Sequence, residues 1–172
     1  MLRKLWRKIA ERKGFTLIEV MVALAIAGLI GTGVTTTIFQ ILSINASSQN
    51  HVLAVKQVEN AATWLNNDVR MAQIIEPGGV SGFPLDLTWV EWDNTTHQVS
   101  YTISNGELQR SSSTNGTQPM QIVVGQYIDD NADNTNCQYS NGVFNFKVTA
   151  SSGGFRRASE TRMAQVIPRS AQ

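Results

Sequence analysis

The first 42 residues of this chain join a basic segment to a long apolar run. Residues 1–14 carry six basic side chains and one acidic one, and residues 15–42 contain a single charged side chain, Glu19. As a helix at about 1.5 Å per residue, the apolar run measures about 42 Å, which exceeds the roughly 30 Å hydrocarbon core of a bilayer. The pattern predicts a helix that spans a membrane.

Glu19 is the unusual residue of this run. A carboxylate in hydrocarbon costs several kcal/mol unless it is neutralised or paired, so a charge inside a membrane helix usually has a function. A plain uncleaved single-pass anchor gains nothing from such a charge. A secretory signal peptide has a shorter apolar stretch, of roughly 7–15 residues, and its cut would fall near Ala46-Ser47-Ser48. A plain single-pass anchor and a secretory signal peptide both remain as alternatives.

The junction of the two segments resembles the N-terminus of type IV prepilins and type II secretion pseudopilins. The matching residues are Lys13-Gly14-Phe15-Thr16-Leu17-Ile18-Glu19, followed by Val20-Met21-Val22-Ala23. The resemblance implies that a prepilin peptidase/methyltransferase cuts after Gly14 and methylates the new amine of Phe15. It also implies that this amine pairs with Glu19 of a neighbouring pilin or pseudopilin subunit, so that the cut permits assembly.

Small side chains recur at a spacing of four in the apolar run. They are Ala23, Ala27, Gly31 and Thr35. Residues at this spacing lie on one face of a helix, where small side chains let two helix backbones approach closely. We expect this face, together with Thr16 and Glu19, to serve assembly, although alanine and glycine are common in membrane helices in any case.

The distribution of charge predicts how the chain is oriented. The basic leader suits the anionic cytoplasmic leaflet, which places the N-terminus inside and the C-terminal domain outside the cytoplasmic membrane, with its lipids around the helix. Residues 15–172 hold eight basic against twelve acidic side chains. This excess of negative charge argues against nucleic-acid binding by the chain without its leader.

Residues 43–76 predict an amphipathic continuation of the helix. Apolar side chains recur in steps of three and four, and Glu76-Pro77-Gly78-Gly79 predicts the helix end. We expect the stripe to pack on the chain's own sheet, with a coiled-coil seam as the alternative. The stripe consists of Val55, Val58, Ala62, Leu65, Val69 and Ala72.

Residues 77–172 predict short strands separated by turns. Asn105-Gly106 and Asn141-Gly142 are hairpin signals, and strand candidates lie at 87–92, 99–103, 108–111, 121–124, 143–150 and 163–167. Strands without intervening helices form an antiparallel sheet, which must bury one face. The expected fold class is α+β, a long N-terminal helix packed on a C-terminal antiparallel β-sheet head, as in pilins.

The sequence therefore divides into a removed leader (1–14), a transmembrane and assembly helix (15–42), its amphipathic continuation (43–76) and the head (77–172). The hairpin at 101–110 and the late strand into Val166-Ile167-Pro168-Arg169 resemble minor pilins and pseudopilins of the J or W type. This resemblance implies a low-copy subunit at or near the tip of a fibre. The shared N-terminus occurs in pilus, secretion and competence systems alike.

The head shows no sequence pattern of an enzyme, because no nucleophile with its base, no metal-spaced cluster and no phosphate loop occurs. Asp129, Asn131 and Asp133 have the spacing of the first ligands of a calcium loop. Asn134 and Ser140, however, stand where such a loop needs glycine and glutamate. The pattern favours a solvated acidic loop, with calcium as the weaker alternative and no other cofactor.

A second function class is a binding module at a fibre tip, for adhesion or DNA uptake. Trp89, Trp92 and Tyr101 are the aromatic residues that such a surface would expose, although packing within the sheet is the simpler role for them. Cys137 is the only cysteine, so no disulfide forms within the chain.

Overall fold

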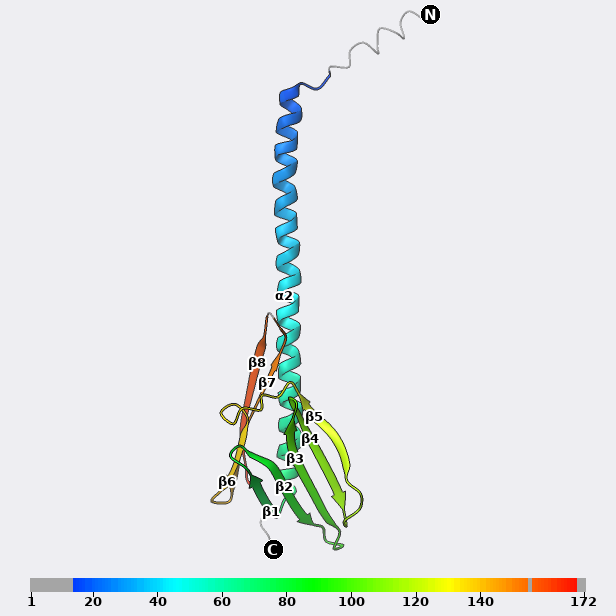
Figure 1. Ribbon diagram of the computed structural model, residues 1–172, viewed down its shortest axis with the longest axis vertical. Helices are drawn as coiled ribbons and strands as arrows, with labels where there is room; N and C mark the ends of the chain where they lie inside the picture. Colours follow the sequence, from blue (N-terminus) through cyan, green and yellow to red (C-terminus); the bar gives the residue numbers. More distant parts are fainter. Residues whose placement is uncertain (1–13, 155, 170–172) are drawn as a thin grey trace, which may run out of the picture. The chain divides into compact units, whose positions relative to one another are not determined.

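The computed structural model describes residues 14–154 and 156–169. Within these residues it has one long helix, α2 (Leu17–Met71), followed by eight strands (Figure 1). The chain divides into two units, residues 1–44 and residues 45–172. Each unit is described by itself.

The described part of the first unit is the apolar half of α2. Residues 14–42 are all exposed, and most of their side chains are apolar. By length and composition, α2 contains a segment able to cross a membrane. The exposed apolar helix is consistent with membrane anchoring. The predicted leader, apart from Gly14, lies outside the described residues.

The second unit is built around the remainder of α2. Val58, Leu65 and Val69 are almost completely buried, and they form one core with inward-facing side chains of the strands. The predicted apolar stripe therefore packs on the chain's own sheets, and the coiled-coil alternative is not needed to cover it.

The helix ends five residues earlier than predicted. Its last residue is Met71, and the chain continues as strand β1 (Ile74–Gly78). The change of direction is held by the neighbouring strand, because Gln73 N donates to Thr88 O at 2.9 Å. Pro77 lies inside β1, at the edge of its sheet, where a missing N–H group is tolerated. The prediction that residues 72–76 are helical was wrong because this pairing is not visible in the local sequence.

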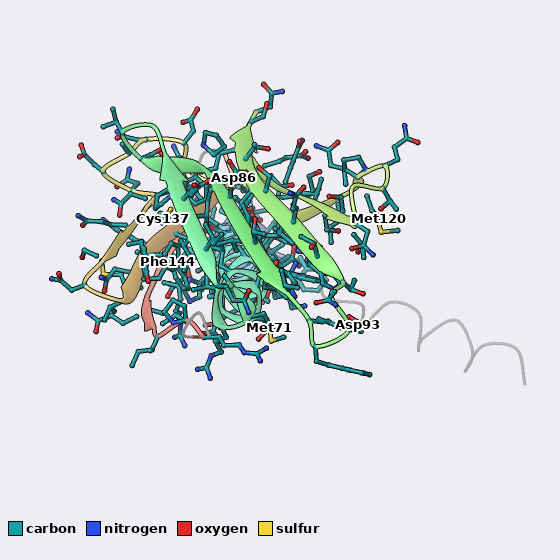
Figure 2. All side chains as sticks on the ribbon, turned by 90° about the horizontal axis from the view of Figure 1, so that it is seen from below. Met71, Asp86, Asp93, Met120, Cys137 and Phe144 are labelled. Carbon is teal, nitrogen blue, oxygen red and sulfur yellow. The ribbon has the colours of Figure 1, made fainter. Side chains whose placement is uncertain are left out.

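Two antiparallel sheets complete the second unit, which confirms the α+β class. Figure 2 shows them beside α2, viewed from the end that carries Met71. The first sheet has the order β1-β2-β3-β4-β5, with β2 (Gly82–Val90), β3 (Thr96–Ser104), β4 (Glu107–Thr114) and β5 (Met120–Gln126). The second has the order β6-β7-β8, with β6 (Asn136–Ser140), β7 (Val143–Ser152) and β8 (Ala158–Val166).

Both Asn-Gly hairpin predictions are confirmed. Asn105 and Gly106 have φ of 53° and 74°, and Asn141 and Gly142 have 52° and 77°. Positive φ at both central residues is the geometry of the type I′ turn that joins paired strands. The sequence did not predict β1 or β6. Both are short, and polar or turn-forming residues make up most of their length.

Candidate functional site

The predicted processing site lies at the start of the described chain. Gly14 and Phe15 precede the first turn of α2, and the Phe15 side chain is 83% exposed. Thr16 and Glu19 then bond each other reciprocally. Thr16 N and Oγ1 donate to Glu19 Oε2 at 3.2 and 3.1 Å, and Glu19 N donates to Thr16 Oγ1 at 3.3 Å. This arrangement is a capping box, which satisfies backbone donors that a helix start leaves free.

The capping box uses one of the two oxygens of the Glu19 carboxylate. Both side-chain bonds use Oε2, so within the described residues Oε1 has no hydrogen-bond partner. Thr16 and Glu19 both follow the Gly14–Phe15 bond, so a cut there would leave the box in place. Among the residues that the structure describes, the carboxylate therefore accepts hydrogen bonds at one of its two oxygens.

The predicted face of small residues is exposed along its length. Gly31 and Thr35 belong to a shallow concave stretch of the helix surface. The other residues of this stretch are Gly28, Thr32, Thr36 and Phe39. The predicted face and this stretch therefore share Gly31 and Thr35.

The threonines of this stretch are compatible with an apolar environment. Thr35 Oγ1 donates to Gly31 O at 2.8 Å, and Thr36 Oγ1 donates to Thr32 O at 2.8 Å. Thr32 and Thr37 bond preceding carbonyls in the same way. Because each hydroxyl finds its acceptor within the helix, these side chains enter lipid without leaving an unsatisfied donor.

The second unit contains a buried ion pair that the sequence did not reveal. Arg110 of β4 donates to Asp68 of α2 through Nε at 2.6 Å and Nη2 at 3.2 Å, and Tyr101 of β3 donates its hydroxyl to the same carboxylate. The Arg110 guanidinium also lies 4.9 Å from the ring centre of Trp64, a cation–π contact. The network ties the helix to two strands.

Burial and the Asp68 carboxylate change the pKa values of Tyr101 and Arg110. Burial, and then the adjacent Asp68 carboxylate, raise the pKa of Tyr101 above its ordinary value. Burial opposes the charge on Arg110, but the hydrogen bond and the charge of Asp68 outweigh it and raise the pKa of Arg110. The tyrosine therefore stays a donor and the arginine stays charged.

Only one of the three aromatic residues suggested for a capture surface is fully exposed. Trp89 and Tyr101 are buried in the core, whereas Trp92 is 94% exposed in the turn after β2. Packing within the sheet, the simpler role, is therefore confirmed for Trp89 and Tyr101, because alternation along β2 and β3 turns them inward. Exposure, as the alternative role requires, is found for Trp92 alone of the three.

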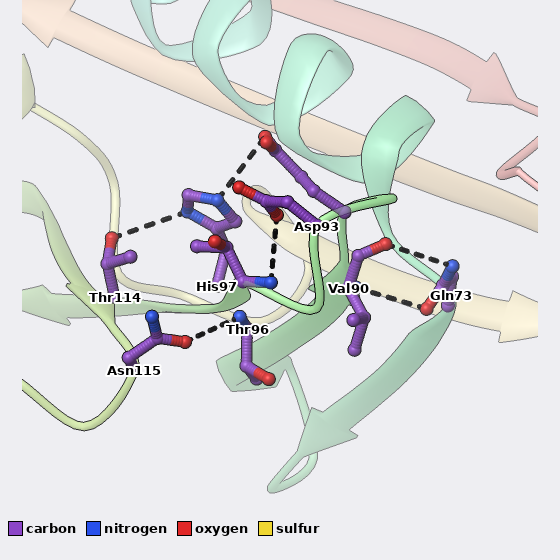
Figure 3. A network of polar contacts seen from close by, with 9 residues as sticks. Gln73, Val90, Asp93, Thr96, His97, Thr114 and Asn115 are labelled. Carbon is purple, nitrogen blue, oxygen red and sulfur yellow. Dashed lines mark hydrogen bonds and ion pairs between the residues drawn. The ribbon is translucent and has the colours of Figure 1, made fainter.

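The turn that carries Trp92 is fastened by polar contacts (Figure 3). The His97 ring stacks on Trp89, with ring centres 5.2 Å apart, and His97 Nε2 lies 3.3 Å from Glu91 Oε1. Thr95 N donates to Asp93 Oδ1 at 2.9 Å, and this backbone bond leads the causes that lower the pKa of Asp93. These contacts give His97, Glu91 and Asp93 a structural role in holding the turn.

Cys137 is a buried thiol. Its Sγ donates to Gly82 O at 3.1 Å, and burial raises the pKa of the thiol to about 12. A thiol with so high a pKa is a poor nucleophile at neutral pH. Cys137 belongs to β6, and its buried contact with Gly82 of β2 indicates a packing role.

The acidic loop directs several of its oxygens to its own polar groups. Asp129 Oδ1 accepts from Asn131 N at 3.1 Å, and Asn131 Oδ1 accepts from Asp133 N at 3.0 Å. Asn134 Nδ2 donates to Asp129 Oδ2 at 3.0 Å. Among residues 14–154 and 156–169, no group of three or more His, Cys, Asp or Glu side chains is arranged to hold a metal ion. Calcium binding here stays the weaker alternative to a solvated acidic loop.

Comparison with known proteins adds one finding. Residues 10–35 match the family model described as the prokaryotic N-terminal methylation motif, and the match includes Gly14, Phe15 and Glu19. Neither the curated proteins nor the solved structures gave a match to the chain. The motif match and the exposed apolar helix that it overlaps support a precursor of the type IV pilin and pseudopilin family.

Proposed function

We propose that this chain is a minor pilin or pseudopilin, cut after Gly14, N-methylated on Phe15 and assembled into a type IV pilus-like or type II secretion fibre. It initiates the fibre at the tip, and it has a structural rather than an enzymatic role. The head lies outside the cytoplasmic membrane until assembly. The observation that carries the proposal is the Glu19 carboxylate at the start of an exposed apolar helix. Among the described residues, only one of its two oxygens accepts hydrogen bonds, and both come from Thr16.

The chemistry of Glu19 explains why the cut would permit assembly. Cleavage after Gly14 creates a positively charged amine on Phe15 without adding a lysine or arginine to the apolar segment. The amine of a neighbouring subunit would neutralise the carboxylate by pairing with Glu19 Oε1. Two charges that are each costly in an apolar environment would then form one ion pair. Removing one partner of a buried ion pair typically costs about 3–5 kcal/mol.

Intact-mass analysis tests the processing step. In cells with prepilin peptidase we expect the chain to lack residues 1–14 and to carry one additional methyl group, and in cells without the peptidase we expect the full-length chain. A chain that begins at Met1 in both strains and still enters fibres would refute the proposal.

Substitution of Glu19 tests the pairing step. Glu19→Ala should be cut normally but should enter fibres at no more than about one hundredth of the wild-type level, as loss of about 3 kcal/mol implies. Glu59→Ala is the matched control, because it removes an exposed carboxylate of the same helix outside the apolar run. Equal recovery of both variants in sheared fibres would contradict the pairing.

A further inference from the structure

The loop between β7 and β8 is fastened to one position on the helix of the second unit. Its described residues are Gly153, Gly154, Arg156 and Arg157. Asn50 Nδ2 of α2 donates to Arg156 O at 2.9 Å. Gly153 has φ of 96° and lies so close to Asn50 that a side chain at this position would collide with it. Figure 1 shows the two strands of this hairpin running along α2. The β7–β8 loop therefore lies at Asn50, near the start of the second unit.

Positive charge is concentrated in the β7–β8 loop. Arg156 and Arg157 are exposed, and within the described residues neither forms an ion pair. No aspartate or glutamate occurs between residues 20 and 58 or between residues 134 and 159. The helix segment and the strand ends that carry the loop therefore hold no acidic side chain. The loop is a cationic site on a chain whose residues 15–172 carry an excess of acidic side chains.

Only a short length of helix separates Asn50 from the apolar run. Leu42 ends that run, and α2 continues without a break through both residues. From Leu42 to Asn50 the helix rises about 12 Å. Tilting keeps an apolar run that is longer than the hydrocarbon core within the core, which puts Leu42 at its edge. Head groups extend about 5–7 Å beyond this edge, so about 5–7 Å would remain between them and Asn50. This gap is shorter than the Debye length of about 8 Å at physiological ionic strength.

We propose that the β7–β8 loop binds anionic phospholipid head groups of the membrane that anchors the chain. The guanidinium groups of Arg156 and Arg157 are the binding groups, because their paired N–H donors match the oxygens of a phosphate. A neutral surface would leave their charge unbalanced, whereas an anionic leaflet attracts basic residues that lie close to it. The proposal rests on membrane anchoring by α2, as in the proposed function, and extends it by giving the head a second contact with the bilayer.

Relaxation enhancement from the membrane surface tests the contact. The full chain is placed in nanodiscs that contain a lipid with a spin-labelled head group, and amide NMR line widths are recorded. One set of discs contains phosphatidylcholine alone, and the other also contains phosphatidylglycerol. We expect greater broadening at Gly153, Gly154, Arg156 and Arg157 in the discs with phosphatidylglycerol, and loss of the difference in high salt. Residues 38–42 report anchoring itself and should broaden in both sets.

Two double variants separate the loop from the net charge of the head. Arg156→Gln with Arg157→Gln should lower the ratio of lipid-bound to free loops about thirtyfold, since two basic residues are lost at the surface. Arg70→Gln with Arg169→Gln is the matched control, which removes the same charge from two exposed arginines. Arg169 N donates to Arg70 O at 3.2 Å, so this pair lies at the other end of the helix of the second unit. The control should leave the ratio unchanged.

The possible outcomes distinguish this proposal from the proposed function. Broadening at residues 38–42 without broadening at the loop would overturn the lipid contact and leave anchoring in place. Equal broadening of the loop in both sets of discs would also overturn it, because proximity alone would then explain the signal. The same loss in both double variants would assign the effect to net charge, against the proposal. Absence of broadening at residues 38–42 as well would refute anchoring, and the lipid contact with it.

Discussion

Glu19 and Asp68 are two carboxylates of one helix, and their surroundings differ. Asp68 is buried in the second unit, where Arg110 and Tyr101 of the same chain use both of its oxygens. Glu19 lies in the exposed apolar unit, where Thr16 uses one oxygen only. A carboxylate that its own chain satisfies stabilises the fold, whereas a partly satisfied one is available to a partner.

Removal of Asp68 should give the largest effect on the head. Asp68→Ala leaves the Arg110 charge and the Tyr101 hydroxyl without their acceptor, which should lower the free energy of unfolding by about 3–5 kcal/mol. Thermal unfolding followed by near-UV circular dichroism measures the loss.

The matched control is the exposed ion pair of Glu59 and Arg162, whose nearest atoms lie 3.4 Å apart. Glu59→Ala should cost only about 0–1 kcal/mol, because water solvates both charges when the pair is broken. Equal losses in the two variants would show that the buried network does not hold the helix to the sheets.

Alkaline pH should weaken the same network by an intermediate amount. The folded-state pKa of Tyr101 is raised above the ordinary value of 10.0, so its contribution to stability is complete below about pH 10 and is lost as pH rises further. The free energy of unfolding should then fall by about 1.4 kcal/mol per pH unit. Urea unfolding at several pH values measures this slope.

Tyr101→Phe isolates the contribution of the phenol. The variant loses the hydrogen bond to Asp68 at every pH, and the part of the alkaline slope that comes from this hydroxyl should disappear. An unchanged slope in the variant would assign the alkaline loss to other groups.

Removal of the capping box should give the smallest effect, confined to the first unit. Thr16→Ala takes away the side-chain bonds that join Thr16 to Glu19, which costs helix starts about 1 kcal/mol. Faster amide hydrogen exchange at residues 17–20, with unchanged exchange in the head, would show this. Thr16→Ser keeps the hydroxyl and serves as the control. Equal exchange in both variants would mean that the box does not stabilise the helix start.

Local patterns explain which parts of the fold were predictable. The Asn-Gly turns, the alternation in β3 and the apolar stripe of α2 each depend on residues that are close in sequence. The end of α2 and the strand β1 were missed because Gln73 and the residues after it pair with β2, and pairing of this kind overrides a local stop signal.

Some functional residues could likewise be predicted from the local sequence, and others could not. Gly14, Phe15 and Glu19 were predicted from a contiguous motif. The capping box follows from the spacing of three between Thr16 and Glu19. Asp68 was missed because its partners come from two distant strands.

By itself, the sequence determined an apolar helix with one internal carboxylate at its start, and an α+β head, because composition and short-range periodicity suffice for both. Only the tertiary structure decided that Asp68 is neutralised within the chain and that Trp89 and Tyr101 are buried. These outcomes depend on which distant residues meet, and contacts between distant residues are specified by packing and strand register rather than by any local run of the sequence.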